Sequence, residues 1–391
     1  MYALPPSHHP PSTMHDNYES DDDSDLISVD SRLTRASSAT SYDVSMRSGS
    51  PAPSVYSITS SLRANSYRHE YGRGLNNYSE VYRLPADDEE LDRLDKQHDM
   101  FRKIMGAYAP PMAEVMADDT PGEIKTVLDL GCGSGSWIMD AARDFPHCQA
   151  VAVDLVPMQA MQVHSHFEFC SKSSLDCRLC REMPENCRSE VDDINLGLQH
   201  FFGDFNVVHA RLISSGIKDY QTLIDHISQV LRTRGLLELY EFDFRVYDKD
   251  HRPIFAPTGV LQPPWFALWM NFLNMAVRQR GGSPDAANML HHWISRHAAF
   301  EEVVYREYFI PTAPFFSHKT PDYHNKRAIA ETFRDDISAF LKSGRPLLLG
   351  SGLPESLVDE LQHRAHQELK EARTETYIRV ENVYARKRPF P

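Results

Sequence analysis

The stretch from Val127 to Leu155, VLDLGCGSGSWIMDAARDFPHCQAVAVDL, restricts the fold of this chain more than any other segment. An apolar run is followed by a turn with three glycines, a helical segment from Ser136 to Asp144, and a second apolar run that ends on an acid. Glycine lets the backbone turn tightly and approach a ligand closely. The stretch therefore predicts a strand–turn–helix–strand unit, as found in parallel α/β sheets.

The rest of the chain continues the alternation of strands and helices. Three further runs, CRSEV, FNVVHA and LLELYEF, predict strands, with a helix over about 218–231 between the last two. Helical patterns follow over 262–280, 284–298, 325–342 and 354–372, and EEVVYREYF and TYIRVENVYARK predict two late strands. The predicted fold class is α/β, with a mostly parallel central sheet and helices on both faces. Helical cap segments over about 262–298 and 325–372 add to this sheet.

The first part of the chain differs in composition from the rest. Residues 1–66 are rich in Ser, Pro and Asp without an apolar period, which predicts a disordered tail. Residues 67–391 form the predicted folded domain. It opens with an amphipathic helix at about 86–106, whose apolar face carries Leu91, Leu94, His98, Phe101, Ile104 and Met105. A histidine on such a face is predicted to be a hydrogen-bonded core residue.

Charge and hydropathy restrict the partners of this chain. Its 391 residues carry a formal net charge of -14, so we expect no broad attraction to nucleic acid or to an anionic membrane. No apolar run approaches the roughly 18 residues of a membrane helix, and the N-terminus lacks the features of a signal peptide. These features predict a cytoplasmic protein, with the nucleus as the alternative, whose six cysteines are thiols or metal ligands rather than disulfides.

Different ligands compete for the glycine turn, which spans Asp129 to Gly135. A P-loop would end in Gly-Lys-Ser/Thr, whereas Ser136 and Trp137 follow the last glycine here. A dinucleotide-binding turn has the spacing G-x-G-x-x-G, whereas this turn reads G-x-G-x-G. The carboxylate of Asp129 would repel a pyrophosphate but would favour a cationic amino group.

A second acid decides between these ligands. Asp154 ends the second strand, 19 residues after Gly135, where a carboxylate can accept hydrogen bonds from the ribose of a nucleoside. The site therefore has an acceptor for ribose hydroxyls and an acid for an ammonium group, but no phosphate-binding motif. This combination fits S-adenosylmethionine. The alternative is an ordinary strand–helix turn with solvated acids.

The segment VLDLGCGSGSW resembles motif I of the class I S-adenosylmethionine-dependent methyltransferases. Four more segments are similar, in the same order, to the fungal LaeA-like methyltransferases, also called the TAM or UMTA type: EVYRLPADDEELDRLDKQHDMF, PENCRSEVDDIN, FNVVHARLISSGIKDYQTLIDHISQVLRTRGLLELYEFD and TETYIRVENVYARKRP. The resemblance covers roughly residues 70 to 391. It implies a Rossmann-like methyltransferase fold and S-adenosyl-L-methionine as the cofactor.

The chain departs from the family pattern at two places. The family usually has Phe-Asp at the start of the fourth strand and Pro-Gly-Gly before the fifth. This chain has Phe205-Asn206 and Thr233-Arg234-Gly235 at these places, and neither is expected to touch the cofactor.

The resemblance also implies which residues hold the cofactor. Asp129, Gly131, Gly133 and Gly135 would border its methionine part, Asp154 would bind the ribose, Asp193 would accept a hydrogen bond from the adenine amino group, and Ile194 would lie against the ring. Asp192 is the second choice for the adenine. The segment His209-Ala210-Arg211 ends the fourth strand, at the edge of the sheet where open α/β folds bind their ligands.

For most residues that could face the methyl acceptor, the sequence leaves two interpretations open. His209 is the candidate general base, with a structural histidine at a strand end as the alternative. Arg211, Glu241 and Trp265 are placed at the rim of the substrate site, and Glu241 could instead face solvent. Trp265 begins an aromatic stripe that is either core or the roof of an apolar pocket. Tyr82 and Arg83 are candidates to close over the cofactor.

An insertion at about 163–184 contains a cluster of thiols. With the following strand it provides Cys170, Cys177, Cys180 and Cys187. A tetrahedral zinc site usually uses two closely spaced pairs, and only one Cys-x-x-Cys pair is present here. We therefore predict no metal site, and Cys187 is expected to pack inside a strand by analogy with the family.

Two functions follow from these features. The first is an S-adenosylmethionine-dependent methyltransferase that modifies a small molecule, by O-methylation in secondary-metabolite biosynthesis. The second is a LaeA-like regulator of secondary metabolism that acts through protein partners or protein methylation, with the N-terminal tail as the docking segment. The partners expected are a small-molecule substrate and, through the tail, other proteins.

Overall fold

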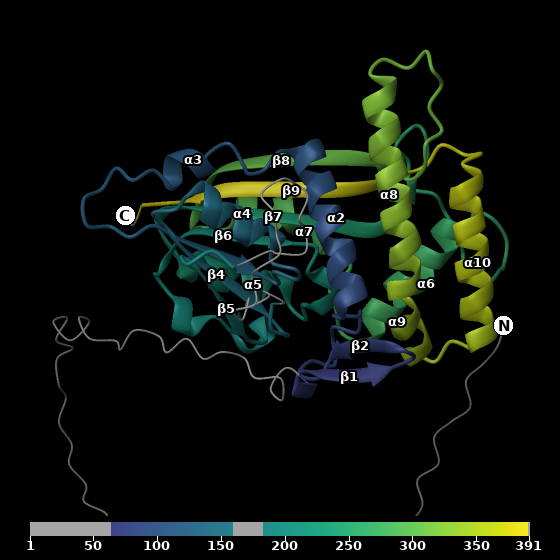
Figure 1. Ribbon diagram of the computed structural model, residues 1–391, viewed down its shortest axis with the longest axis horizontal. Helices are drawn as coiled ribbons and strands as arrows, with labels where there is room; N and C mark the ends of the chain where they lie inside the picture. Colours follow the sequence, from purple (N-terminus) through teal and green to yellow (C-terminus); the bar gives the residue numbers. More distant parts are fainter. Residues whose placement is uncertain (1–63, 159–182, 390–391) are drawn as a thin grey trace, which may run out of the picture. The chain divides into compact units, whose positions relative to one another are not determined.

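The computed structural model describes residues 64–158 and 183–389, and Figure 1 labels their helices and strands. These residues belong to one compact unit, Ser57–Pro391. The predicted tail up to residue 63 lies outside the described residues. So does most of the predicted cysteine insertion, with Cys170, Cys177 and Cys180.

A seven-stranded sheet forms the centre of the fold, in the order β5-β4-β3-β6-β7-β9-β8. The first five strands of this order are parallel to their neighbours, whereas β9 is antiparallel to both β7 and β8. The strands are β3 (Thr126–Leu130), β4 (Gln149–Asp154), β5 (Cys187–Val191), β6 (Phe205–Arg211), β7 (Leu231–Tyr247), β8 (Phe300–Pro311) and β9 (Tyr377–Lys387). The sheet is mostly parallel, as predicted, and its central strands are apolar because both faces are covered.

Helices cover both faces of this sheet, as the alternation along β3 illustrates. Val127 packs with α3 (Met112–Val115) and α4 (Ser136–Asp144) on one face. Leu128 and Leu130 point to the opposite face and pack with α5 (Tyr220–Val230) and α7 (Ala286–Arg296). Each leucine buried in this way contributes about 1.5–3 kcal/mol. The predicted two-sided α/β architecture is confirmed (Figure 1).

A third apolar core lies where β7 ends and β9 begins. It joins the sheet to α2 (Asp88–Met105), α6 (Trp265–Gln279), α8 (Tyr323–Ser343), α9 (Arg345–Gly350) and α10 (Glu355–Glu371). Trp269 and Phe244 are among its largest fully buried side chains. These helices, from two distant parts of the chain, lie beside one another in Figure 1 and supply the cap over one end of the sheet.

The amphipathic helix near the start of the domain is α2, and both of its ends have capping residues. The side chain of Asp87 accepts a hydrogen bond from the backbone N–H of Glu90, and three acids occupy the first turn. Gly106 ends the helix with a φ of 91°, a conformation that favours glycine. His98 is buried, as predicted for its apolar face.

The structure contains elements that the sequence analysis did not predict. At the start of the folded domain, β1 (Tyr67–Glu70) and β2 (Arg73–Asn76) form an antiparallel hairpin. The hairpin has no alternation of apolar residues; Asp87 fixes it instead, accepting hydrogen bonds from the Arg73 guanidinium and from Gly74 N–H. Strand β7 also extends beyond the predicted LLELYEF in both directions. The short helices α3 and α9 were not predicted.

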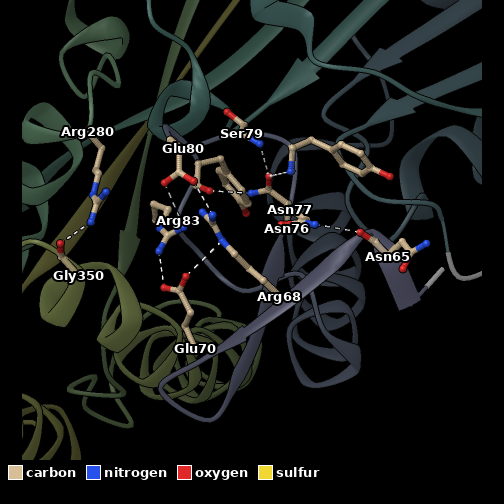
Figure 2. Close-up of polar contacts among 12 residues, drawn as sticks. Asn65, Arg68, Glu70, Asn76, Asn77, Ser79, Glu80, Arg83, Arg280 and Gly350 are labelled. Atoms are coloured by element: carbon tan, nitrogen blue, oxygen red, sulfur yellow. Dashed lines mark hydrogen bonds and ion pairs between the residues drawn. The ribbon is translucent and has the colours of Figure 1, made fainter. Parts of the chain in front are cut away.

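Charged side chains fasten the hairpin to the segment that leads into α2. Figure 2 shows Glu70 between Arg68 and Arg83, and Glu80 on the same two arginines. Arg83 is buried and both of its carboxylate partners are partly exposed. The predicted contact of Arg83 with the cofactor site is wrong, because this network holds its guanidinium and Arg83 does not line the cavity described below.

Candidate active site

The glycine turn after β3 has the backbone that its sequence predicts. Gly131, Gly133 and Gly135 have φ values of 69°, 55° and 76°, in the left-handed region. A β-carbon at Gly131 would lie 2.5 Å from Ile213, and one at Gly133 would lie 2.9 Å from Leu94. Side chains are therefore excluded from this turn both by conformation and by space. Gly131 and Gly133 line a cavity at the carboxyl ends of the parallel strands, whereas Gly135 caps the start of α4.

Asp154, at the end of β4, faces the same cavity. Its Oδ2 accepts a hydrogen bond of 2.8 Å from Gly133 N–H, and its Oδ1 accepts one of 3.3 Å from Val156 N–H. Burial raises the pKa of this carboxyl group, and the backbone hydrogen bonds oppose that shift. The acid therefore ties the glycine turn to β4 and still presents a carboxylate to the cavity.

The loop after β5 places the predicted adenine contacts along the cavity. Asp192, Asp193 and Ile194 all line it. The Oδ1 atom of Asp193 accepts hydrogen bonds from the backbone N–H (3.0 Å) and the side-chain amide (2.8 Å) of Asn195, and so caps a short 3-10 turn, η2 (Ile194–Leu196). Asn195 also donates to Gly216 O, 2.9 Å away, and so joins this loop to the loop after β6. Sequence reasoning missed Asn195, although it directly follows the predicted residues.

Asp129 and His209 form a buried pair on adjacent strands. They are register partners in β3 and β6, and His209 Nδ1 lies 2.8 Å from Asp129 Oδ1. Because a carboxylate only accepts, Nδ1 carries the proton. Burial lowers the pKa of His209, so the ring is neutral and its Nε2 is an acceptor. The ring stacks on Trp137, with the ring centres 3.7 Å apart.

The environment of His209 supports a positioning role more directly than a catalytic one. The side chain is 1% exposed, although it contributes to the cavity wall. Its Nε2 atom has no hydrogen-bond partner among the described residues. The residue fixes the orientation of Asp129, and its function as a general base stays a prediction.

Two residues predicted at the substrate rim lie elsewhere. Glu241 is completely buried: its Oε1 accepts hydrogen bonds from Ile213 N–H (2.9 Å), Ser214 N–H (3.0 Å) and Tyr220 Oη (3.0 Å). It shapes the loop after β6 and faces neither the acceptor nor solvent. The strand continues past it, which is why the expected exposure at a strand end was wrong.

Trp265 is the second of these corrections. Its backbone N–H donates to Glu368 of α10, and Arg364 lies 5.7 Å from its ring centre. The ring faces α10 because Trp265 opens α6 on the side away from the cavity. Its neighbour Phe266 lines the cavity instead. The predicted aromatic stripe consists of Trp265, Phe266, Trp269, Phe272 and Met275. Most of it is core, as the first interpretation had it, but Met275 is 54% exposed.

The cavity continues from the strand ends beneath the cap helices. Aromatic side chains from several elements line this second half: Phe101 of α2, Phe242 and Phe244 of β7, Phe266 of α6, and Phe333 and Phe340 of α8. A buried ion-pair group adds a polar part to the wall. Arg93 donates to Glu90 at 2.6 Å and to Asp336 at 2.7 Å. Sequence reasoning missed this group because 243 residues separate Arg93 from Asp336.

Tyr82 also lines the cavity, and its closure over the cofactor stays a prediction. Asn76 of β2 donates to the backbone carbonyl of Tyr82 at 2.7 Å. The ring packs on Gly216, where a β-carbon would lie only 3.1 Å from it. Burial raises the pKa of Tyr82, so the side chain is neutral.

The described residues contain no group of three or more side chains that could hold a metal ion. Cys187 is buried in β5, as expected. In the described segments, no helix is both long enough and apolar enough to cross a membrane.

Comparisons with known proteins identify the family of this chain. Residues 97–301 match a family model described as a methyltransferase domain. The chain is 45% identical over 323 residues to the secondary metabolism regulator laeA of Coprinopsis cinerea, covering 82% of this chain and 74% of that protein. It is 33% identical over 174 residues to a protein-methionine methyltransferase laeA of Emericella nidulans, covering 42% and 43%.

A solved structure resembles the chain more distantly. It is phosphoethanolamine N-methyltransferase 2 of Haemonchus contortus in complex with S-adenosyl-L-methionine, with a TM-score of 0.39 and 15% identity. The similarity covers 81% of this chain and 62% of that one.

The strand order, the glycine turn with its two acids and the match to the methyltransferase domain all lead to one conclusion about the family. The cofactor is S-adenosyl-L-methionine. The sequence identity to the regulator of Coprinopsis cinerea extends over most of both chains. The chain is a class I S-adenosylmethionine-dependent methyltransferase and belongs to the LaeA-like family.

Proposed function

We propose that this methyltransferase modifies a small, largely apolar molecule of secondary metabolism, at a hydroxyl or carboxyl oxygen. The observation that supports this is the aromatic half of the cavity, which continues directly from the glycine turn. Small-molecule sites are typically apolar, with a few polar groups that fix orientation. The buried group of Glu90, Arg93 and Asp336 supplies such polar atoms at the wall.

The proposed cofactor contacts follow the carboxylates around the first half of the cavity. Asp129 would accept hydrogen bonds from the ammonium group of the methionine part, next to Gly131 and Gly133. Asp154 would accept from the ribose hydroxyls. Asp193 would accept from the adenine amino group, with Ile194 against the ring. Each of these residues lines the cavity.

The protein's task in methyl transfer is mainly one of placement. When bound, the cofactor supplies a methyl group on a sulfonium centre, and the acceptor must approach that carbon in line. The buried, neutral ring of His209 holds Asp129 through Nδ1–H and leaves Nε2 free to accept a proton from a hydroxyl acceptor. A carboxylate acceptor would need no base.

A second function is favoured by a different observation. The relatives from Coprinopsis cinerea and Emericella nidulans are named a secondary metabolism regulator and a protein-methionine methyltransferase. A regulator of this kind would methylate a protein side chain or act through protein partners. The N-terminal segment 1–66 would then be the docking segment.

One labelling experiment separates the two functions. Purified protein is incubated with methyl-labelled S-adenosylmethionine and an extract of the source cells, and the label is followed into the organic-soluble and protein fractions. Label in the organic fraction supports the small-molecule function. Label confined to the protein fraction contradicts it and supports the regulator. Deletion of residues 1–66 should leave small-molecule transfer unchanged.

A further inference from the structure

Arg211 lines the cavity and has no carboxylate partner at ion-pair distance among the described residues. Arg83, Arg93 and Arg379 each have a carboxylate oxygen within 3 Å of the guanidinium. In the described residues, no ion pair within 4 Å forms at Arg211, although this side chain is half-buried and lines the cavity. A guanidinium group without a counterion is costly in such a place.

The surroundings hold this guanidinium in a fixed position. Arg211 ends β6, and its guanidinium carbon lies 5.4 Å from the ring centre of Phe101 in α2. Its Nη2 donates to His98 Nδ1 at 3.2 Å, and His98 Nε2 in turn lies 3.0 Å from Asp140 Oδ2. Burial lowers the pKa of His98, so the ring stays neutral and can accept from Arg211 while it donates to Asp140.

The remaining donors of the guanidinium are available to a ligand. A guanidinium carries five N–H groups in a planar fork that matches a carboxylate, and among the residues that the structure describes only one of them has a hydrogen-bond partner. The carboxylates of Asp129 and Glu238 act on Arg211 at longer range, outside ion-pair distance. Within residues 64–158 and 183–389, the site thus contains an oriented cation without a carboxylate at ion-pair distance, and a bound carboxylate would supply its counterion.

We propose that Arg211 binds a carboxylate group in this cavity. This inference rests on the proposed function, in which the cofactor and the methyl acceptor occupy the two halves of the cavity that Arg211 lines. Two sources have this chemistry: the methionine carboxylate of the cofactor, and a carboxylate on the methyl acceptor. In both cases the residue binds and orients a ligand.

The first arm of the test measures the cofactor source. The dissociation constants of S-adenosylhomocysteine and of its decarboxylated analogue are measured calorimetrically for the wild type and for Arg211→Gln. If Arg211 holds the cofactor carboxylate, the wild type should prefer S-adenosylhomocysteine by about tenfold or more, and the variant should lose this preference. Arg211→Lys should restore it in part. Arg278→Gln, which removes an exposed cation paired with Asp285, is the control for net charge.

The second arm measures the acceptor source on protein saturated with S-adenosylhomocysteine. The probes are 4-phenylbutyrate and the uncharged 4-phenylbutyramide, which share an aromatic ring and differ in charge. If Arg211 holds an acceptor carboxylate, the acid should bind about tenfold or more tightly than the amide. Arg211→Gln should abolish that difference while its affinity for S-adenosylhomocysteine stays unchanged.

Stability separates ligand binding from a structural role. Arg211→Gln removes a charge that has no counterion, so the ligand-free variant should unfold at the same temperature as the wild type or higher. The proposal is overturned if neither carboxylate preference depends on Arg211, or if the variant is folded less stably and binds all probes as the wild type does. Failure of the wild type to bind S-adenosylhomocysteine at all would instead contradict the proposed function.

Discussion

At the scale of single residues, Asp154 has two tasks. It holds the glycine turn through Gly133 N–H, and it is proposed to bind the ribose. Asp154→Ala should therefore weaken S-adenosylhomocysteine binding by about 100-fold or more, since two charge-assisted hydrogen bonds are lost at about 1.5–3 kcal/mol each. Calorimetric titration measures this. Asp204→Ala, an exposed acid at the start of β6, is the matched control, and equal affinities in both variants would refute the assignment.

Glu238 leads to a prediction about pH. It is fully buried, accepts a hydrogen bond from Tyr240 Oη, and burial raises its pKa to about 7. An acid whose pKa is raised in the folded state binds its proton more tightly there than in the unfolded chain. It therefore lowers stability as the pH rises from about 4.5 to about 7, by about 3 kcal/mol in total at about 1.36 kcal/mol per unit.

Comparison of the wild type with Glu238→Gln isolates this contribution from the buried histidines, whose lowered pKa values act in the opposite direction. The free energy of unfolding is measured in urea at pH 5 and pH 8. Relative to the wild type, the variant should gain about 2.5 kcal/mol between these pH values, because part of the total loss already occurs below pH 5. A constant difference between the two proteins would show that Glu238 does not titrate in this range.

The residue scale also shows what sequence can and cannot reveal about the site. Asp129, Gly131, Gly133 and Asp154 are predictable, because their spacing within one strand–turn–helix–strand unit brings them together. Glu241 and Trp265 were misplaced, because the burial of a strand residue and the direction of a helix face depend on elements that pack there from elsewhere in the chain. Arg211 was predicted at the rim of the substrate site because it ends the fourth strand. Its lack of a carboxylate partner among the described residues could be found only from the structure.

At the scale of elements, Asp87 joins the hairpin to α2. It caps the helix and also accepts from Arg73 and Gly74. Asp87→Ala should lower the free energy of unfolding by about 2–3 kcal/mol, from a lost helix cap and lost charge-assisted hydrogen bonds. Asp87→Asn keeps the cap and should cost less. Urea unfolding measures both, and a change below about 0.5 kcal/mol, typical of surface substitutions, would argue against this anchoring role.

Helices and strands were predictable to the extent that their residues show a period. The long helices α2, α6, α8 and α10 and the central strands were all predicted from such patterns. The hairpin β1–β2 was not, since ion pairs and hydrogen bonds with later residues hold it. Such contacts leave no periodic signal in the sequence.

At the scale of the whole molecule, one cavity connects the strand ends to the cap helices. Ile337 of α8 is buried and lines the aromatic half. Ile337→Trp should fill that half, and methyl transfer to the organic fraction should fall by tenfold or more, about 1.4 kcal/mol, while S-adenosylhomocysteine affinity stays unchanged. Thr332→Trp, on the exposed face of α8, is the control for helix packing. Equal transfer by both variants would place the acceptor elsewhere.

The proposed function requires that the cofactor lie at the ends of β3, β4 and β5. A crystal structure of the protein with S-adenosylhomocysteine tests this most directly. We predict the ribose hydroxyls on Asp154, the adenine beside Asp193 and Ile194, and the ammonium group on Asp129. Bound S-adenosylhomocysteine at another place, with these carboxylates in contact only with solvent, would contradict the central claim.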